Sequence, residues 1–219
     1  MDLNSVHLAN IWPWAHWLYW PILCWALYRA PWSILLQKDS SNILFATCVF
    51  LFLLWHLKIN VAEGLSIHLL GSTALTLMFR WQVALISNAL ILIGITLSTP
   101  ADFAALPMNG LITGVLPVAI SYLIWRFNEW YLPANYFIYI FIAAFFSAGL
   151  SILASGYVSF RLLTLINQLP AETLEEYLLI FIPIMYPEAF LTGAAISIFV
   201  IYKPEWIATF DDRRYLDHQ

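Results

Sequence analysis

Glu63-Gly64-Leu65-Ser66-Ile67-His68-Leu69-Leu70-Gly71-Ser72 is a polar, glycine-containing entrance to an apolar segment that continues to Phe79. If the segment is a helix, Gly64, His68 and Gly71 fall at i, i+4 and i+7 and share one face. Such a face can approach other backbone closely, or receive an ion. Because an ionisable side chain inside a membrane segment is costly and usually faces a bundle interior, we expect His68 to belong to a functional site.

The composition indicates a polytopic membrane protein. The chain has 219 residues, of which 62% are hydrophobic and 10% charged, and its mean hydropathy is +0.79. These values lie outside the range of soluble domains. We predict an all-α fold with a single integral membrane domain over residues 1–219, including a charged cytoplasmic tail at 203–219. The start of the chain lacks the basic region of a cleaved signal peptide, so we expect it to stay in the mature protein.

Seven membrane spans can be drawn from apolar runs of about 17–25 residues. They cover residues 14–28, 42–57, 64–79, 82–98, 109–125, 135–157 and 177–202. With the N-terminus outside and the C-terminus cytoplasmic, seven of the nine Lys and Arg residues fall inside, as the positive-inside rule requires. We therefore expect a multi-pass protein of the inner (plasma) membrane, surrounded by lipid, with the polar ends of the third, fifth and seventh spans on the outer side.

The last span offers a partner for His68. Pro183 and Pro187 are expected to break this span, and Glu188 follows the second proline. A carboxylate inside an apolar run is hard to explain as filler, and we predict that it meets His68 in the bundle interior. The alternatives are that Glu188 binds a freed backbone amide or a basic residue.

Three further residues are candidates for the same site. Asn109 opens a second glycine-flanked polar entrance, with Thr113 one turn later. His7 and His16 lie in a tryptophan-rich N-terminal region that is typical of an outer aromatic belt, so an interfacial role is the alternative for both.

Several functional classes are disfavoured. The scattered basic residues form no stripe for binding nucleic acid. The chain has no Gly-x-x-x-x-Gly-Lys-Ser/Thr loop, so it carries no ATP site of that type and any ATP dependence must come from another subunit. It also lacks the His-Glu-x-x-His, Cys-x-x-Cys and Gly-x-Ser-x-Gly patterns, and we do not expect an enzyme.

Three motifs together resemble a known family. Gly64-Leu65-Ser66-Ile67-His68-Leu69-Leu70-Gly71, Asn109-Gly110-Leu111-Ile112-Thr113-Gly114 and Pro187-Glu188-Ala189-Phe190-Leu191-Thr192-Gly193 are similar in order and spacing to the CbiM and NikM membrane components of energy-coupling factor transporters. The resemblance implies uptake of a divalent transition metal, cobalt or nickel, as the substrate. It also implies a second membrane subunit and cytosolic ATPases as partners.

The family's metal site is matched in part. In these proteins the metal is bound by an N-terminal Met-His, through the terminal amine, the next backbone amide and the imidazole, and by the histidine of the Ser-x-His-Leu stretch. His68 matches the last ligand, whereas the nearest likeness to the opening is Val6-His7-Leu8, which has residues ahead of it. A site of His68 with His7 or His16, or with Glu188, would be looser and could suit another ion.

Two functional hypotheses follow from this resemblance. The first is a substrate-capturing permease component that takes up a divalent metal while its partners hydrolyse ATP. The alternative is a family-derived membrane assembly or accessory protein whose polar core serves mainly in helix packing. Bound metal in the purified protein supports the first hypothesis, and a partner complex without stoichiometric metal supports the second.

The predicted orientation can be tested with topology reporters fused at Lys38 and at Asp102. Because of the Lys/Arg asymmetry, we expect the Lys38 fusion to report the cytoplasm and the Asp102 fusion to report the outer side. The opposite result at either position would contradict the orientation and the shared side of the polar entrances.

Overall fold

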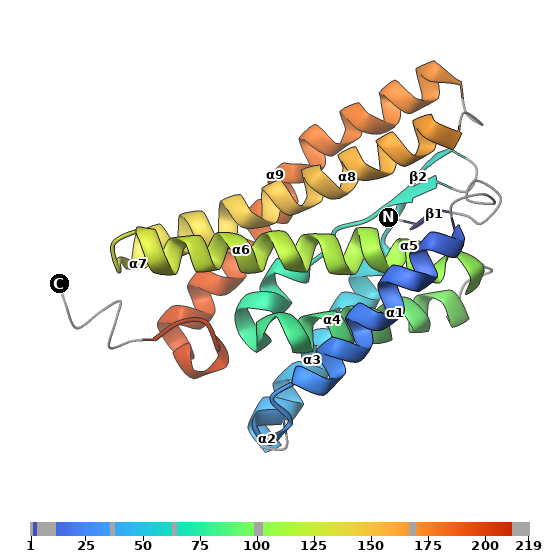
Figure 1. The fold of residues 1–219 in the computed structure, drawn as a ribbon. Helices are drawn as coiled ribbons and strands as arrows, with labels where there is room; N and C mark the ends of the chain where they lie inside the picture. The colour runs from blue at the N-terminus through green and yellow to red at the C-terminus, as the bar shows by residue number, and fades with distance from the viewer. Residues whose placement is uncertain are drawn as a thin grey trace.

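The computed structural model describes residues 2–3, 12–35, 38–62, 65–98, 103–166 and 170–211, and these form a helical bundle with a small sheet at one end (Figure 1). The elements before and within the sheet are β1 (Asp2–Leu3), α1 (Trp12–Arg29), α2 (Trp32–Leu35), α3 (Lys38–His56), β2 (Ile59–Ala62) and β3 (Leu65–Ile67). The elements that follow are α4 (Ser72–Ser98), η2 (Phe103–Ala105), α5 (Leu106–Asn109), η3 (Gly110–Val115), α6 (Leu116–Tyr131), α7 (Tyr136–Ile138), η4 (Tyr139–Phe146), α8 (Ser147–Ile166), α9 (Ala171–Tyr202) and η5 (Pro204–Trp206).

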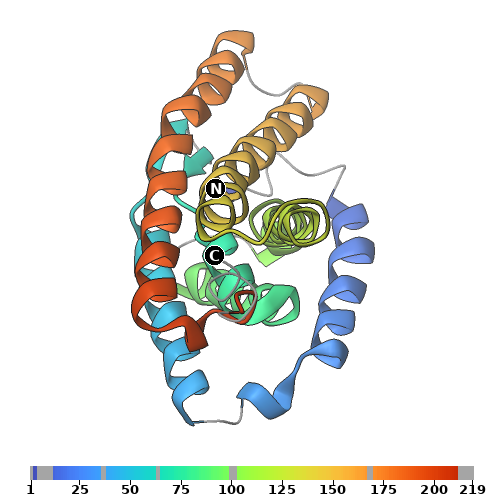
Figure 2. The same ribbon diagram turned by 90° about the vertical axis from the view of Figure 1, so that its left-hand side faces the viewer.

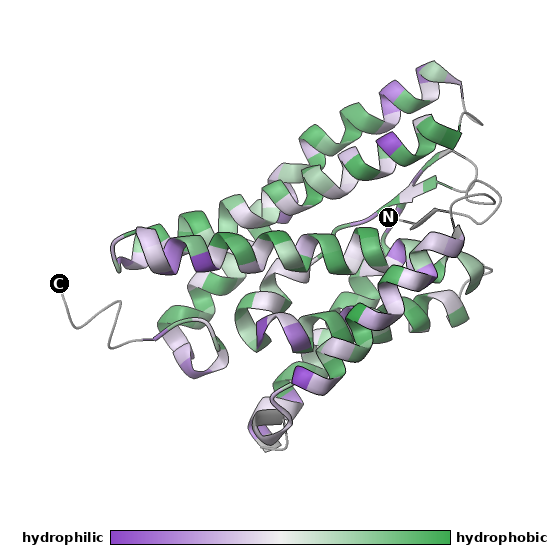
Figure 3. Ribbon diagram, viewed as in Figure 1, coloured by the Kyte–Doolittle hydropathy of each residue, from purple (hydrophilic) through white to green (hydrophobic). Residues whose placement is uncertain are grey.

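The long helices lie in layers. Figure 2 shows α1 along one side and α3 with α9 along the other, with α4, α6 and α8 between them. The three strands, in the order β1-β3-β2, lie at one end of the bundle, and α2, α7 and the C-terminal segment lie at the other (Figure 1). Hydrophobic residues occur along all the long helices, and many of the hydrophilic ones lie near the helix ends (Figure 3).

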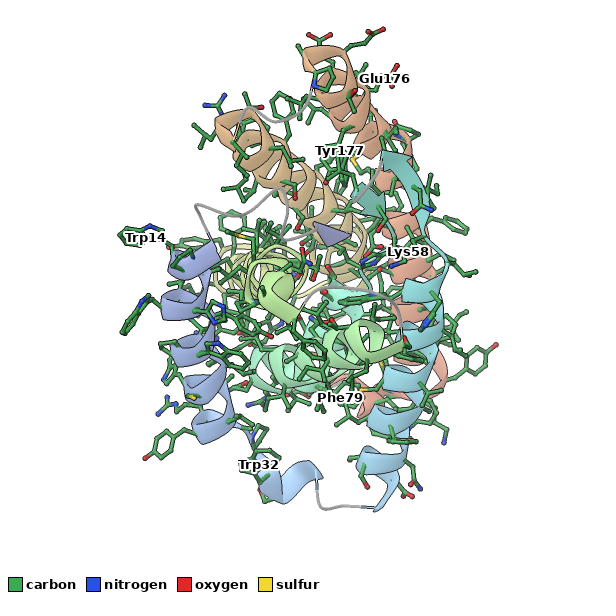
Figure 4. All side chains as sticks on the ribbon, turned by 90° about the vertical axis from the view of Figure 1, so that its right-hand side faces the viewer. Trp14, Trp32, Lys58, Phe79, Glu176 and Tyr177 are labelled. Atoms are coloured by element: carbon green, nitrogen blue, oxygen red, sulfur yellow. The ribbon has the colours of Figure 1, made fainter. Side chains whose placement is uncertain are left out.

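The lengths and composition of the helices fit a multi-pass membrane protein. Among the described residues, five helical segments are long and apolar enough to cross a membrane: Asp39–His56, Ser72–Ser98, Phe103–Tyr131, Tyr136–Ile166 and Ala171–Tyr202. Helix α1 is a further long helix of 18 residues. Its Trp14 and Trp17 are largely exposed, and Trp14 points away from the bundle in Figure 4. We predicted an all-α fold, and the fold observed is nearly all-α, with a three-stranded sheet in addition.

The prediction of one helix over residues 64–79 is wrong in its first half. Leu65–Ile67 is a strand that pairs with β1 and β2. Gly71 then takes a φ of +65°, which L side chains disfavour, and the helix begins at Ser72. His68 and Gly71 therefore do not share a helix face, and Gly64 lies outside the described residues.

Helix α4 itself is two helices joined at Arg80. This residue has φ 67° and ψ 164°, so the helical backbone is interrupted there. We call residues 72–79 the half-helix. It is about 12 Å long at 1.5 Å per residue, too short to cross the hydrocarbon core alone. The third and fourth predicted spans meet at this break.

The predicted break in the last span is also wrong, because α9 is continuous from Ala171 to Tyr202 with both Pro183 and Pro187 inside it. Packing against α8 accounts for its continuity. Gly156 of α8 leaves room for the Phe181 ring, and Gly149 for the Met185 side chain. Close contacts at small residues are how helices associate in lipid.

Replacing Gly71 with Ala should lower stability for two reasons: the alanine would have to adopt a positive φ, and its Cβ would collide with the side chain of Leu51. We expect a loss of about 1–3 kcal/mol, seen as a lower melting temperature in detergent. Gly114→Ala is the matched control, since the nearest atom to its added Cβ is Asn88 Cβ at 3.5 Å, an ordinary contact. Equal melting temperatures for the two variants would contradict the argument.

Candidate metal site

The chain between β3 and the half-helix forms an irregular loop, residues 68–71, which we call the His68 loop. Irregular backbone within a membrane protein must have its polar groups satisfied by other parts of the protein. The N–H groups of Leu70 and Gly71 donate to the carboxylate of Glu188, each at 2.8 Å. The carbonyl of Leu70 accepts from Trp55 Nε1 at 3.0 Å. Helices α3 and α9 therefore hold this loop between them.

His68 lies inside this frame with only 4% of its surface exposed. Its Nδ1 lies 2.8 Å from the carbonyl oxygen of Leu69, and since a carbonyl can only accept, Nδ1 carries the proton. In a neutral imidazole this leaves the lone pair on Nε2, the arrangement in which histidine binds metals. The ring also packs against Trp55, with the centroids 4.6 Å apart. The imidazole thus has a fixed position and a defined tautomer.

Glu188 is buried, and both of its oxygens accept from the His68 loop. Of the alternatives left open by the sequence, the structure therefore has the one in which Glu188 binds freed backbone amides. Its negative charge also sits at the N-terminus of the half-helix, where the helix dipole favours it. The two amides that it binds follow His68 by two and three residues. Its observed contacts therefore support the loop.

A buried polar network continues from the loop into the bundle. Ser72 Oγ donates to the carbonyl of Thr113 at 3.0 Å and accepts from Asn88 Nδ2 at 3.1 Å. Further along, Thr73 and Ser121 exchange a hydrogen bond of 2.8 Å. These contacts join the half-helix to η3, α6 and the second half of α4. The sequence-based prediction did not include Trp55 or Asn88, although an amide in the middle of an apolar run could have drawn attention to the second.

The other predicted site residues are placed as follows. Asn109 is buried at the end of α5, and its carbonyl accepts from Thr113 Oγ1 at 2.7 Å, one turn further along the chain. His16 is half-buried on α1, where its Nδ1 accepts from Trp20 Nε1 at 3.1 Å. His7 lies outside the described residues. Within the described part of the chain, no group of three or more His, Cys, Asp and Glu residues is gathered closely enough to hold a metal ion.

The fold and the site together define a class: a multi-pass helical membrane protein in which one segment is made of a strand, a loop and a short helix, with a buried histidine in the loop. The chain belongs to the CbiM family, described as the cobalt uptake substrate-specific transmembrane region, which matches residues 8–206. A solved structure described as a truncated transition metal transporter has the same fold, with a TM-score of 0.75 and 16% sequence identity over 92% of this chain and 98% of that chain. The comparison with curated proteins gives no match.

Glu188→Gln should loosen the His68 loop, because an amide has one acceptor oxygen and would turn an NH₂ group toward one of the two N–H donors. A lost charge-assisted bond costs roughly 1.5–3 kcal/mol. We expect a lower melting temperature and faster hydrogen exchange of the Leu70 and Gly71 amides. Glu172→Gln, in the exposed first turn of α9, is the control. Unchanged exchange at both amides would rule out the support role.

Proposed function

We propose that this protein captures a divalent transition metal ion of the cobalt or nickel class and takes part in its uptake across the plasma membrane. The observation that carries the proposal is His68, a buried imidazole whose tautomer and position are fixed by a loop that two other helices hold. Imidazole is a good ligand for first-row divalent ions. Membership of the CbiM family, and the fold shared with a transition metal transporter, support the same function.

The remaining ligands are proposed to come partly from the N-terminal segment. Strand β1 pairs with β3 so that Asp2 lies opposite Ser66, two residues before His68. At the other end of that segment, Ala15 of α1 belongs to the same buried cluster as Leu65 and Leu70. In the sequence, His7 lies between these two elements, and we propose it as a further ligand. His16, Asn109 and Glu188 are the further candidates, and Glu188 would act chiefly by holding the loop.

The orientation that suits this function has the β-strands and the His68 loop toward the outer side. Arg80 lies near Pro31, Glu205 and Trp206 at the opposite end, which also carries the C-terminal segment. Lys203 begins that segment. Lysine and arginine concentrated at this end support a cytoplasmic location for it. We propose seven passes in all, with the third formed by β3, the His68 loop and the half-helix.

Transport would depend on partner subunits. The chain carries no Walker loop, so ATP hydrolysis is proposed to come from cytosolic ATPases through a second membrane subunit, as in energy-coupling factor transporters. An accessory role without transport is the alternative, in which the network around Ser72, Asn88 and Thr113 serves helix packing alone. Metal content separates the two, because only the first requires a stoichiometric divalent ion in the purified protein.

His68→Ala should abolish metal capture and leave the protein folded, because three bonds from Glu188 and Trp55 still hold the loop backbone when the bond from the imidazole to Leu69 is lost. Affinity for Co²⁺ and Ni²⁺ measured by titration calorimetry, alongside a thermal melt, checks this. The control is His56→Ala, since His56 is exposed and bonds to Phe52 and Ser98. Binding should also weaken in acid, because protons compete with the metal for a ligating imidazole. Equal affinities of wild type and His68→Ala would favour the accessory role.

A further inference from the structure

The chain beyond α9 returns to the half-helix. After η5, the N–H of Ala208 donates to the carbonyl of Met78 at 3.0 Å. Thr209 donates twice to the carbonyl of Leu77, from its N–H at 3.2 Å and from its hydroxyl at 2.7 Å. We call residues 207–210 the clasp. It joins parts of the sequence that lie about 130 residues apart.

The break at Arg80 explains why these two carbonyls accept from the clasp. Carbonyls in the last turn of a helix have no donor one turn further on, and buried ones must find partners elsewhere. Leu77 and Met78 are both buried at the end of the half-helix. The clasp supplies the missing donors, so that the C-terminal end of the half-helix is completed by a distant segment.

The clasp is itself fixed to the bundle. Ile207, Thr209 and Phe210 are buried. The carbonyl of Thr209 accepts from Trp125 Nε1 at 3.2 Å, and its hydroxyl lies 2.8 Å from the hydroxyl of Tyr139. Because the Thr209 proton goes to the carbonyl of Leu77, the Tyr139 hydroxyl is the donor in that pair. The Phe210 ring packs edge-on against Tyr139, with the centroids 5.1 Å apart.

The opposite end of the half-helix forms the His68 loop, and Glu188 of α9 holds it there. Glu188 and Thr209 belong to one continuous stretch of chain, α9 followed by the clasp. This stretch therefore forms hydrogen bonds at both ends of the half-helix, which is about 12 Å long. In the first turn of the half-helix, the side chain of Ser72 also bonds to the carbonyl of Thr113, and that of Thr73 bonds to Ser121.

We infer that the clasp is the element through which the cytoplasmic end of the protein controls metal release at His68. Detaching the clasp exposes the carbonyls of Leu77 and Met78 and allows the half-helix to shift, which loosens the loop bonded to Glu188. The clasp follows directly on Lys203 and Glu205, which are both exposed, so that a partner protein at that surface can reach it. This inference rests on the proposed metal site. Thr209 does not contact the metal and acts by positioning the half-helix.

The test uses the full chain in detergent with Co²⁺ as the probe. Thr209→Val removes the hydroxyl and its two bonds with little change of shape. We expect Co²⁺ to dissociate at least about tenfold faster, which corresponds to 1.4 kcal/mol, and the Leu70 and Gly71 amides to exchange faster. Thr47→Val is the matched control, because that hydroxyl bonds only within its own helix, to the carbonyl of Ile43 at 2.8 Å. Tyr139→Phe is a milder second variant, which removes one donor to Thr209 and serves if Thr209→Val does not fold.

The outcomes separate this inference from the proposed function. If wild type binds Co²⁺ while Thr209→Val and Tyr139→Phe leave both release and loop exchange unchanged, the clasp does not control the site. Exchange that rises equally in the loop and throughout α8 would show a purely structural role and would also overturn the inference. If wild type binds no Co²⁺, the proposed function fails, and metal control by the clasp fails with it. Loop exchange in the variants then shows whether the mechanical coupling exists without a metal.

Discussion

The rest of the site depends on one contact: the carboxylate of Glu188 accepts hydrogen bonds from two backbone N–H groups of the His68 loop. Within a membrane, an N–H group without a partner costs several kcal/mol, and an irregular loop exposes more such groups than a helix does. The two oxygens of one carboxylate satisfy two neighbouring amides at once. Because the same charge lies at the start of a helix, the helix dipole offsets part of the cost of burying it.

This contact permits an interrupted membrane segment. The segment enters as a strand, turns at Gly71 and continues as the half-helix, which Arg80 ends after about two turns. Other parts of the fold supply hydrogen-bond partners wherever this segment departs from regular helix. Strands β1 and β2 pair with β3, Trp55 and Glu188 bond to the loop, and the clasp donates to the carbonyls of the last helical turn. The imidazole of His68 is held in place by its bond to Leu69 and its packing against Trp55, within a loop that Glu188 supports.

Hydroxyl groups connect the helices around this segment. Ser121 donates to its own helix at Pro117 and also contacts Ser151 of α8, while Ser155 donates to the carbonyl of Ile112 in η3. Polar side chains of this kind join helices in lipid, where the hydrophobic effect gives no preference for one helix surface over another. Much of the buried polarity of this protein therefore serves packing. What distinguishes His68 is a ring whose orientation is fixed inside a loop held by other helices.

The sequence by itself determined the membrane class and the positions of most helices, and it drew attention to His68 and Glu188. Apolar runs of span length and a histidine and a glutamate within such runs are local properties, visible without any contact. The sequence did not determine that residues 65–67 form a strand or that α9 continues through Pro183 and Pro187, because pairing with β1 and β2 and packing against α8 outweigh local preference in both places. Only the tertiary structure decided that Glu188 holds backbone amides and that Thr209 completes the half-helix. Both contacts join residues more than 100 positions apart, and no periodicity in a sequence records which distant donor meets which acceptor.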